Sequence, residues 1–136
     1  AIVNYLTDVV FADRDLPPVY RRAGDEFKER RKALAKLIEE DWQEAARQLA
    51  ALAINRLLRG TPAFTFYDLV TYLEVNGERF LQGMYHWTPV LSSFGRLVFF
   101  GDFDRAGAGV LDWFPGYRRG NLGVVLSRSA KVESGE

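Results

Sequence analysis

The residue types that most often carry out chemistry in small proteins are scarce in this chain of 136 residues. Cysteine is absent and His86 is the single histidine, so neither thiolate chemistry nor a zinc site is expected. His86 stands beside Trp87, and no serine or cysteine nucleophile motif accompanies it. This setting favours a loop or capping role for His86 over that of a catalytic base.

Two short motifs have some of the residues of a ligand-binding loop. Asp102 and Asp104 have the alternating carboxylates of a calcium loop, but the other EF-hand ligands are missing and two glycines follow. The run from Gly107 to Gly109 lacks the lysine and the strand-to-helix setting of a phosphate loop. We therefore expect a turn at these aspartates. The sequence predicts a protein that is not an enzyme and has no cofactor, metal or small-molecule substrate.

Composition indicates one ordinary globular domain. Hydrophobic residues make up 48% and aromatic residues 14%, which excludes disorder over most of the length. The apolar runs are shorter than a membrane-spanning helix needs, and the N-terminus lacks the layout of a signal peptide. We expect an intracellular protein, in the cytoplasm or on the nucleoid, with no membrane partner.

The charges cancel overall but are partly segregated along the chain. There are 18 basic and 18 acidic residues, a balance that counts against a dedicated nucleic-acid packing protein. One local basic excess lies between residues 21 and 36, and another between residues 96 and 131. The first predicts a secondary basic surface made of Arg21, Arg22, Lys28, Arg30, Arg31 and Lys32. These excesses permit DNA contact without requiring it.

Residues 1–24 form an N-terminal arm that is apolar at its start and is interrupted by a double proline at Pro17 and Pro18. The prolines remove two backbone donors and push Leu16 out of the helical region. Two alternatives fit this segment. It is either a short helix docked on the body of the protein or an arm that reaches a neighbouring subunit.

Residues 25–59 predict a long helix, because they contain no proline or glycine and their apolar positions recur every three, four or seven residues. As one helix it would be about 50 Å long, more than a body of this size can cover. It therefore either breaks near Glu39–Asp41, where Asp41 caps a second helix, or projects. We expect self-association through this segment.

The remaining chain predicts two more helices and then strands. One helix begins after Thr65 and stops at Asn76-Gly77, and another runs from Pro89 to Arg96 with Thr88 as its N-cap. Strands are expected at residues 97–100, 110–114 and 122–126. The last two form a hairpin whose tip, residues 115–121, is basic and rich in glycine.

This order of elements resembles the winged helix-turn-helix superfamily over residues 41–128. The local signs are short runs at the openings of helices and strands: Leu58-Arg59-Gly60, Phe64-Thr65, Trp87-Thr88-Pro89-Val90-Leu91 and Gly95-Arg96-Leu97-Val98. The resemblance implies an α+β, mainly helical fold, with a single domain at residues 25–128 that ends in a C-terminal β-hairpin. Residues 129–136 would be a polar tail.

The resemblance also implies a DNA-binding surface. The helix from Pro89 would lie in the major groove and the hairpin tip would be the wing. The implied contact residues are Thr88, Ser92, Ser93, Arg96, Tyr117, Arg118 and Arg119. Because few of these can read base edges, backbone or shape recognition is expected. In the alternative interpretation, the serines are merely solvated and the arginines keep a hairpin tip soluble. Trp42, Trp87 and Trp113 are expected in the core rather than as stacking platforms, because each lies among apolar neighbours.

Two classes of function follow. The first is a protein that binds double-stranded DNA as a dimer or larger assembly, in either a regulatory or an architectural role. The architectural variant includes an archaeal-virus-like nucleocapsid subunit, which would place the chain in a virion. The second is a protein–protein interaction adaptor of the same fold, which the neutral charge favours.

Overall fold

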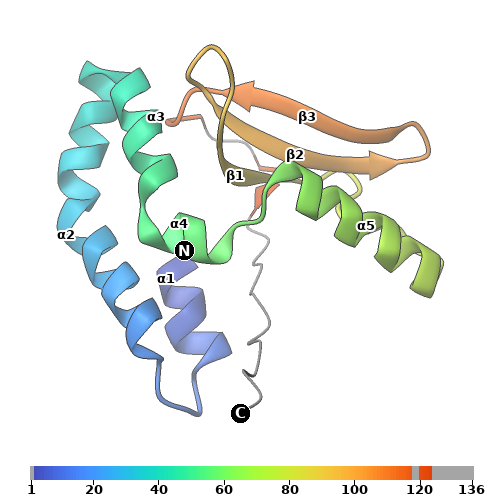
Figure 1. The fold of residues 1–136 in the computed structure, drawn as a ribbon, viewed down its shortest axis with the longest axis horizontal. Coiled ribbons are helices and arrows are strands. Elements are labelled where there is room, and N and C mark those ends of the chain that lie inside the picture. Colours follow the sequence, from blue (N-terminus) through green and yellow to red (C-terminus); the bar gives the residue numbers. More distant parts are fainter. Residues whose placement is uncertain (1, 118–119, 124–136) are drawn as a thin grey trace, which may run out of the picture.

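A computed structural model describes residues 2–117 and 120–123, with helices in the first half of the chain and a sheet in the second (Figure 1). The helical elements are α1 (Ile2–Tyr5), the π-helical turn η1 (Leu6–Val10), α2 (Pro18–Glu40), α3 (Trp42–Ala51), α4 (Ala53–Leu58) and α5 (Pro62–Asn76). The strands are β1 (Tyr85–Leu91), β2 (Leu97–Asp104), β3 (Gly107–Trp113) and β4 (Leu122–Gly123). The expected α+β, mainly helical class is confirmed.

The long helix starts earlier than its sequence pattern indicated. α2 begins at Pro18 rather than Asp25, because proline fits the first helical position, where a backbone N–H has no intrahelical partner. Ala23 and Gly24, which the prediction placed in the arm, are buried residues of α2. The predicted boundary at residue 24 is therefore wrong for the helix.

The predicted break near Asp41 is confirmed. The Asp41 backbone leaves the helical region, and its Oδ1 accepts a hydrogen bond from the Glu44 backbone N–H at 3.1 Å, which caps α3. α2 and α3 fold back side by side (Figure 1), and Arg30 Nη2 on α2 donates to Gln48 Oε1 on α3 at 2.7 Å. A second break at Leu52 separates α3 from α4, and Glu26 Oε2 accepts the Ala53 N–H there at 3.1 Å.

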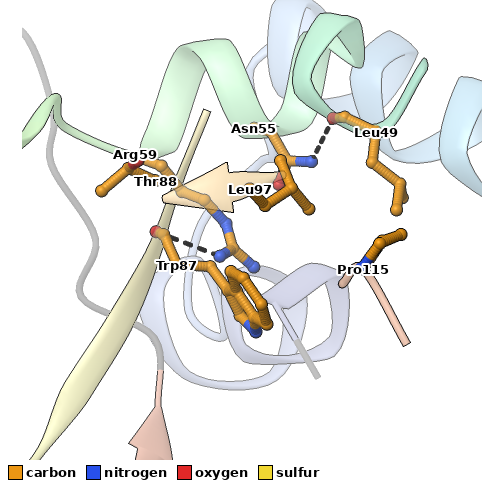
Figure 2. A pocket seen from close by; sticks show the side chains of 7 residues that line it. All are labelled: Leu49, Asn55, Arg59, Trp87, Thr88, Leu97 and Pro115. Carbon is orange, nitrogen blue, oxygen red and sulfur yellow. Dashed lines mark hydrogen bonds between the residues drawn. The ribbon is translucent and has the colours of Figure 1, made fainter. Parts of the chain in front are cut away.

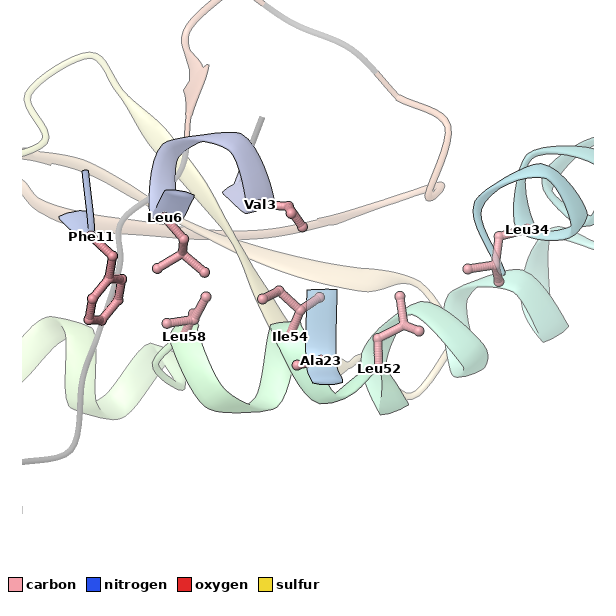
Figure 3. Packing of buried hydrophobic residues seen from close by; sticks show 8 residues of the cluster. All are labelled: Val3, Leu6, Phe11, Ala23, Leu34, Leu52, Ile54 and Leu58. Carbon is pink, nitrogen blue, oxygen red and sulfur yellow. The ribbon is translucent and has the colours of Figure 1, made fainter. Parts of the chain in front are cut away.

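The helices enclose one apolar cluster, shown in Figure 3. Its buried members are Val3, Leu6, Phe11, Ala23, Leu34, Leu52, Ile54 and Leu58. They come from the N-terminal segment, α2 and the Leu52–Leu58 region, so the first residues of the chain complete this core. Of the two alternatives for the arm, the structure has the docked one.

α5 starts earlier than predicted and ends where predicted. Thr61, not Thr65, is its N-cap: the Thr61 hydroxyl accepts from the Phe64 N–H at 3.3 Å, and Pro62 follows as the first helical residue. Thr65 is a buried residue within the helix. Gly77, with a φ of +71°, ends the helix in the left-handed conformation that glycine favours.

The expected recognition helix from Pro89 to Arg96 is absent, and this prediction was wrong. Residues 85–91 form β1, which pairs antiparallel with β2. The register shifts between Trp87 and Leu91, a bulge where Pro89 needs no ladder hydrogen bond. The Thr88 hydroxyl, expected to cap a helix, instead donates to the Val98 carbonyl oxygen at 2.8 Å and accepts from the Val90 N–H at 3.3 Å.

The expected C-terminal hairpin is also wrong in its pairing. The sheet order is β3-β2-β1-β4, so the partner of β3 is β2 and not the strand near residue 122. A tight turn joins β2 to β3, where Asp104 Oδ1 accepts from the Ala106 N–H at 2.7 Å. β4 instead lies parallel to β1. The rest of the predicted last strand, residues 124–126, and the predicted tail, residues 129–136, lie outside the described residues.

Candidate functional site

The predicted DNA-contact residues do not come together as one face. Thr88 is 2% exposed and its hydroxyl is engaged inside the sheet, so it is not available to a phosphate or base. Ser92 organises the turn between β1 and β2: its Oγ accepts from the Phe94 and Arg96 backbone N–H groups, each at 3.3 Å. Of the two serines, Ser93 is the exposed one.

Arg96 and Tyr117 were also predicted to contact DNA, and both have partners within the chain. Arg96 lies 3.9 Å from Asp112, and its guanidinium lies 4.9 Å from the ring centroid of Phe114. The Tyr117 ring packs against Trp113, with centroids 4.5 Å apart. Arg118 and Arg119, the predicted wing cations, lie outside the described residues. The winged-helix arrangement is therefore not confirmed.

The secondary basic surface on α2 is largely open to solvent. Five of its six cations are exposed: Arg21, Arg22, Lys28, Arg31 and Lys32. Arg30 differs, since it is half-buried and pairs with Glu26 at 3.5 Å. Within the described part of the chain, none of the five exposed cations has a carboxylate within ion-pair distance. The exposed carboxylates Asp25 and Glu29 lie between them on α2, so residues 21–32 keep a net excess of positive charge.

A large apolar surface lies on α5 and β3, where the sequence pattern gave no warning of it. The most exposed large hydrophobic residues of α5 are Phe64, Tyr67 and Val75, at 70%, 69% and 76%. Val110 and Trp113 of β3 are also exposed, so Trp113 is not the core residue that was expected. An open apolar groove of about 330 Å³ lies between the two elements, lined by Pro62, Ala63, Phe66, Phe100, Ala108 and Val110.

By contrast, residues 25–59, the expected self-association segment, use much of their apolar face inside the chain. Leu34, Leu52, Ile54 and Leu58 are at most 3% exposed and belong to the helical core. The apolar face that led us to expect an interface between copies therefore packs against this chain's own body.

A second cavity, of about 200 Å³, lies where the helical half meets the sheet (Figure 2). Leu49, Asn55, Arg59, Trp87, Thr88, Leu97 and Pro115 line it. Arg59 follows α4, and its Nη1 donates to the Trp87 carbonyl oxygen at 3.1 Å. Burial lowers the pKa of Arg59 to about 10, which leaves the guanidinium charged at neutral pH.

His86 lies beside this cavity, inside the sheet. It is 1% exposed, and its ring is 6.3 Å from that of Phe100, measured between centroids. Burial lowers the pKa of His86 to about 4, and the charge of Arg59 acts in the same direction, while the Trp87 backbone offsets part of the effect. His86 is therefore neutral at pH 7, and it is a core residue rather than the expected loop or capping residue.

The turn predicted at the Gly-Asp-Phe-Asp motif is confirmed at Asp104, which closes the β2–β3 turn, and is wrong at Asp102. Asp102 lies within β2, and its Oδ1 accepts from the Gly83 N–H at 3.0 Å. Residues 2–117 and 120–123 contain no group of three or more His, Cys, Asp or Glu side chains arranged to hold a metal ion. Nor does any helix in those ranges have both the length and the apolar character that crossing a bilayer demands.

Comparisons with protein-family models, with curated proteins and with solved structures found no match for this chain.

Proposed function

We propose that this protein binds double-stranded DNA through the phosphate backbone, without reading base sequence. The observation that carries the proposal is the row of five exposed cations on α2, which form no described ion pair and outnumber the exposed carboxylates Asp25 and Glu29 between them. Cations of this kind release counterions from duplex DNA when they contact phosphates, and this release drives sequence-independent binding. The neutral net charge of the chain does not oppose this, because the field near α2 is set by local charges.

The spacing of these cations suits contact along a strand of DNA. At 100° per residue, Arg21, Lys28 and Lys32 fall within about 40° of one another around the helix. They span about 16 Å along its axis, while Arg22 and Arg31 flank this line. A helix of this kind can lie along a phosphodiester backbone without entering a groove, which fits the lack of base-reading side chains.

Salt dependence of binding to a random-sequence duplex tests the proposal. With five phosphate contacts, the slope of log affinity against log salt is about −4.5, which is a loss of roughly 500-fold between about 50 and 200 mM salt. Replacing Arg21, Lys28 and Lys32 with glutamine leaves about two contacts, and the slope falls to about −1.8. Absence of binding by the unmodified protein at the lower salt concentration would contradict the proposal.

A matched triple variant separates local contact from net charge. Arg47, Arg56 and Arg105 are exposed and lie away from the basic face of α2, on α3, on α4 and in the β2–β3 turn. Replacing these three with glutamine removes the same amount of positive charge. The salt slope of this control stays within about one unit of the original. An equal loss in both triple variants would mean that overall charge, and not α2, governs binding.

The alternative function is a protein–protein interaction adaptor, and the exposed aromatic surface favours it. Exposed apolar patches of this extent on a small domain usually mark sites of association. Phe64, Phe66 and Tyr67 are exposed on α5, and Val110 of β3 is exposed at the groove beside that helix. The same surface suits an architectural DNA-binding protein whose copies associate along the duplex, including an archaeal-virus-like nucleocapsid subunit. The DNA-binding proposal also includes a second form, in which the protein acts as a dimer with a regulatory role.

A further inference from the structure

We propose that the cavity beside Arg59 is a binding site for a small organic carboxylate. This site is separate from the basic face of α2, so the inference stands whether or not the protein binds DNA. The cavity lies between the α3–α4 region, β1, β2 and Pro115, and Figure 2 shows the Arg59 side chain extending into it beside Trp87.

The Arg59 guanidinium is a positive charge without a described counterion. Nη1 donates to the Trp87 carbonyl oxygen, whereas Nε is buried with no acceptor and Nη2 has none among the described residues. No carboxylate of the described chain lies within ion-pair distance of this guanidinium. A buried cation is costly unless an anion compensates it, so the cavity favours an anionic occupant.

Among the described residues that line the cavity, Arg59 alone carries a charge. His86 adds no second positive charge at pH 7, because its pKa is lowered to about 4. One guanidinium matches one monoanion in charge. Its terminal donors also match the planar geometry of a carboxylate group, which Nη2 can bind while Nη1 keeps its bond to Trp87.

The walls of the cavity offer few other hydrogen-bond donors. Thr88 donates its hydroxyl proton to Val98, and the Asn55 side-chain amide donates to the Leu49 carbonyl oxygen at 2.6 Å. The remaining surface is aliphatic or aromatic, from Leu97, Pro115 and others. A phosphate group with three acceptor oxygens would leave several of them unsatisfied here, whereas a carboxylate on an apolar body would not.

The volume limits the size of the ligand. About 200 Å³ holds on the order of six waters at roughly 30 Å³ each. A monocarboxylic acid with a small ring or a short branched chain fits this space. The carboxylate can come from solution or from this chain's own Glu133 and Glu136, which lie outside the described residues.

Titration with sodium benzoate, followed by amide and Trp87 indole resonances, tests the site, with sodium chloride at equal ionic strength as the salt control. We expect saturation with a dissociation constant on the order of 1 mM and shifts centred on the residues that line the cavity. Arg59→Met weakens binding at least about tenfold, because it removes a charge-assisted hydrogen bond. Arg56→Met, an exposed arginine on the same α4 helix, leaves the affinity unchanged.

A second variant keeps the test decisive if Arg59→Met fails to fold. Leu49→Phe retains the guanidinium but narrows the cavity, and it should also weaken benzoate binding several-fold. The double variant Glu133→Gln, Glu136→Gln identifies the source of the carboxylate. Tighter benzoate binding in this variant means that the chain's own carboxylates compete for the site, and unchanged binding means that the ligand comes from solution. The proposal is overturned if neither the unmodified protein nor this double variant binds benzoate, or if Arg56→Met weakens binding as much as Arg59→Met does.

Discussion

The burial of His86 makes the stability of this protein depend on pH below neutrality. In the folded chain its pKa is lowered to about 4, against an ordinary value of 6.5. The unfolded chain therefore binds a proton more readily than the folded chain does. The stabilisation from a neutral His86 is fully present above about pH 6.5, and it is lost as the pH falls from there towards 4. Acid thus favours unfolding through this residue.

The size of the effect follows from these two values. For a group with a pKa of about 4 when folded and about 6.5 when unfolded, the free energy of unfolding falls by about 2 kcal/mol between pH 7.5 and pH 5. This loss is a large fraction of the stability of a small domain, about 5–15 kcal/mol. His86→Leu, which cannot be protonated, should not show it.

Urea denaturation at several pH values measures this difference directly. Carboxylates also titrate in part of this range, but they contribute equally to the protein and to its His86→Leu variant, so the difference between the two curves isolates the histidine. Because the chain has one histidine, a single pair of ring-proton resonances reports its folded pKa without any assignment problem. Parallel stability curves, or a folded pKa near 6.5, would refute the reasoning.

Three further predictions concern the fold and the exposed aromatic surface. Gly101→Ala places a methyl group against the backbone at the start of β1, so it should lower the free energy of unfolding, measured by heat or urea, by more than about 2 kcal/mol. Gly120→Ala is the control, because no atom lies within 4 Å of its new Cβ, and it should lower the free energy of unfolding far less. Asp41→Ala removes the N-cap of α3 and should cost about 1 kcal/mol by the same measurement; no change would mean that the break needs no cap. Phe64→Ser with Tyr67→Ser should change the free energy of unfolding by less than about 0.5 kcal/mol per site while lowering self-association in sedimentation, and unaltered association would exclude this face as the interface between copies.

Local signals predicted those parts of the fold that local interactions decide. Two features predict the break at Asp41: a side chain that can cap a helix, and a helical segment longer than a protein of this size can cover. Both can be read from the sequence. The end of α5 at Gly77 needs only a residue that tolerates a positive φ. The β2 strand was found from its run of apolar β-formers, although it extends further, to Asp104.

The segment around Thr88 and Pro89 could not be predicted in this way. A threonine followed by a proline is a good helix start, and nothing within the segment shows that β2 will pair with it. The pairing with β2 decides the conformation, and the bulge absorbs the proline that would otherwise argue against a strand. Once residues 85–91 are in the sheet, the expected recognition surface cannot form.

The cavity beside Arg59 was missed for a related reason. An arginine at the end of a helix ordinarily lies in solvent, and its burial here follows from β1 packing across the end of α4, a contact between distant parts of the sequence. The exposed aromatics of α5 were missed because alternation and helical periodicity report which face is apolar, but not whether another element covers it. The basic residues of α2 were predicted correctly because charged side chains on a helix are ordinarily exposed to solvent, whatever the tertiary contacts of that helix.

The separation of these surfaces makes the two proposed functions distinguishable. The basic face belongs to α2 and the apolar face to α5, and these two helices lie towards opposite ends of the long axis of the molecule in Figure 1. If copies associate along DNA through the apolar face, binding is multivalent, and its apparent affinity exceeds that of one copy without any new phosphate contact. The Phe64→Ser, Tyr67→Ser variant would then bind more weakly and without cooperativity, yet keep the same salt slope per copy, because its α2 cations are unchanged. A loss of slope in that variant would instead mean that the aromatics themselves contact the nucleic acid. If the protein is an adaptor, neither surface would bind duplex DNA, and the apolar face alone would bind a protein partner.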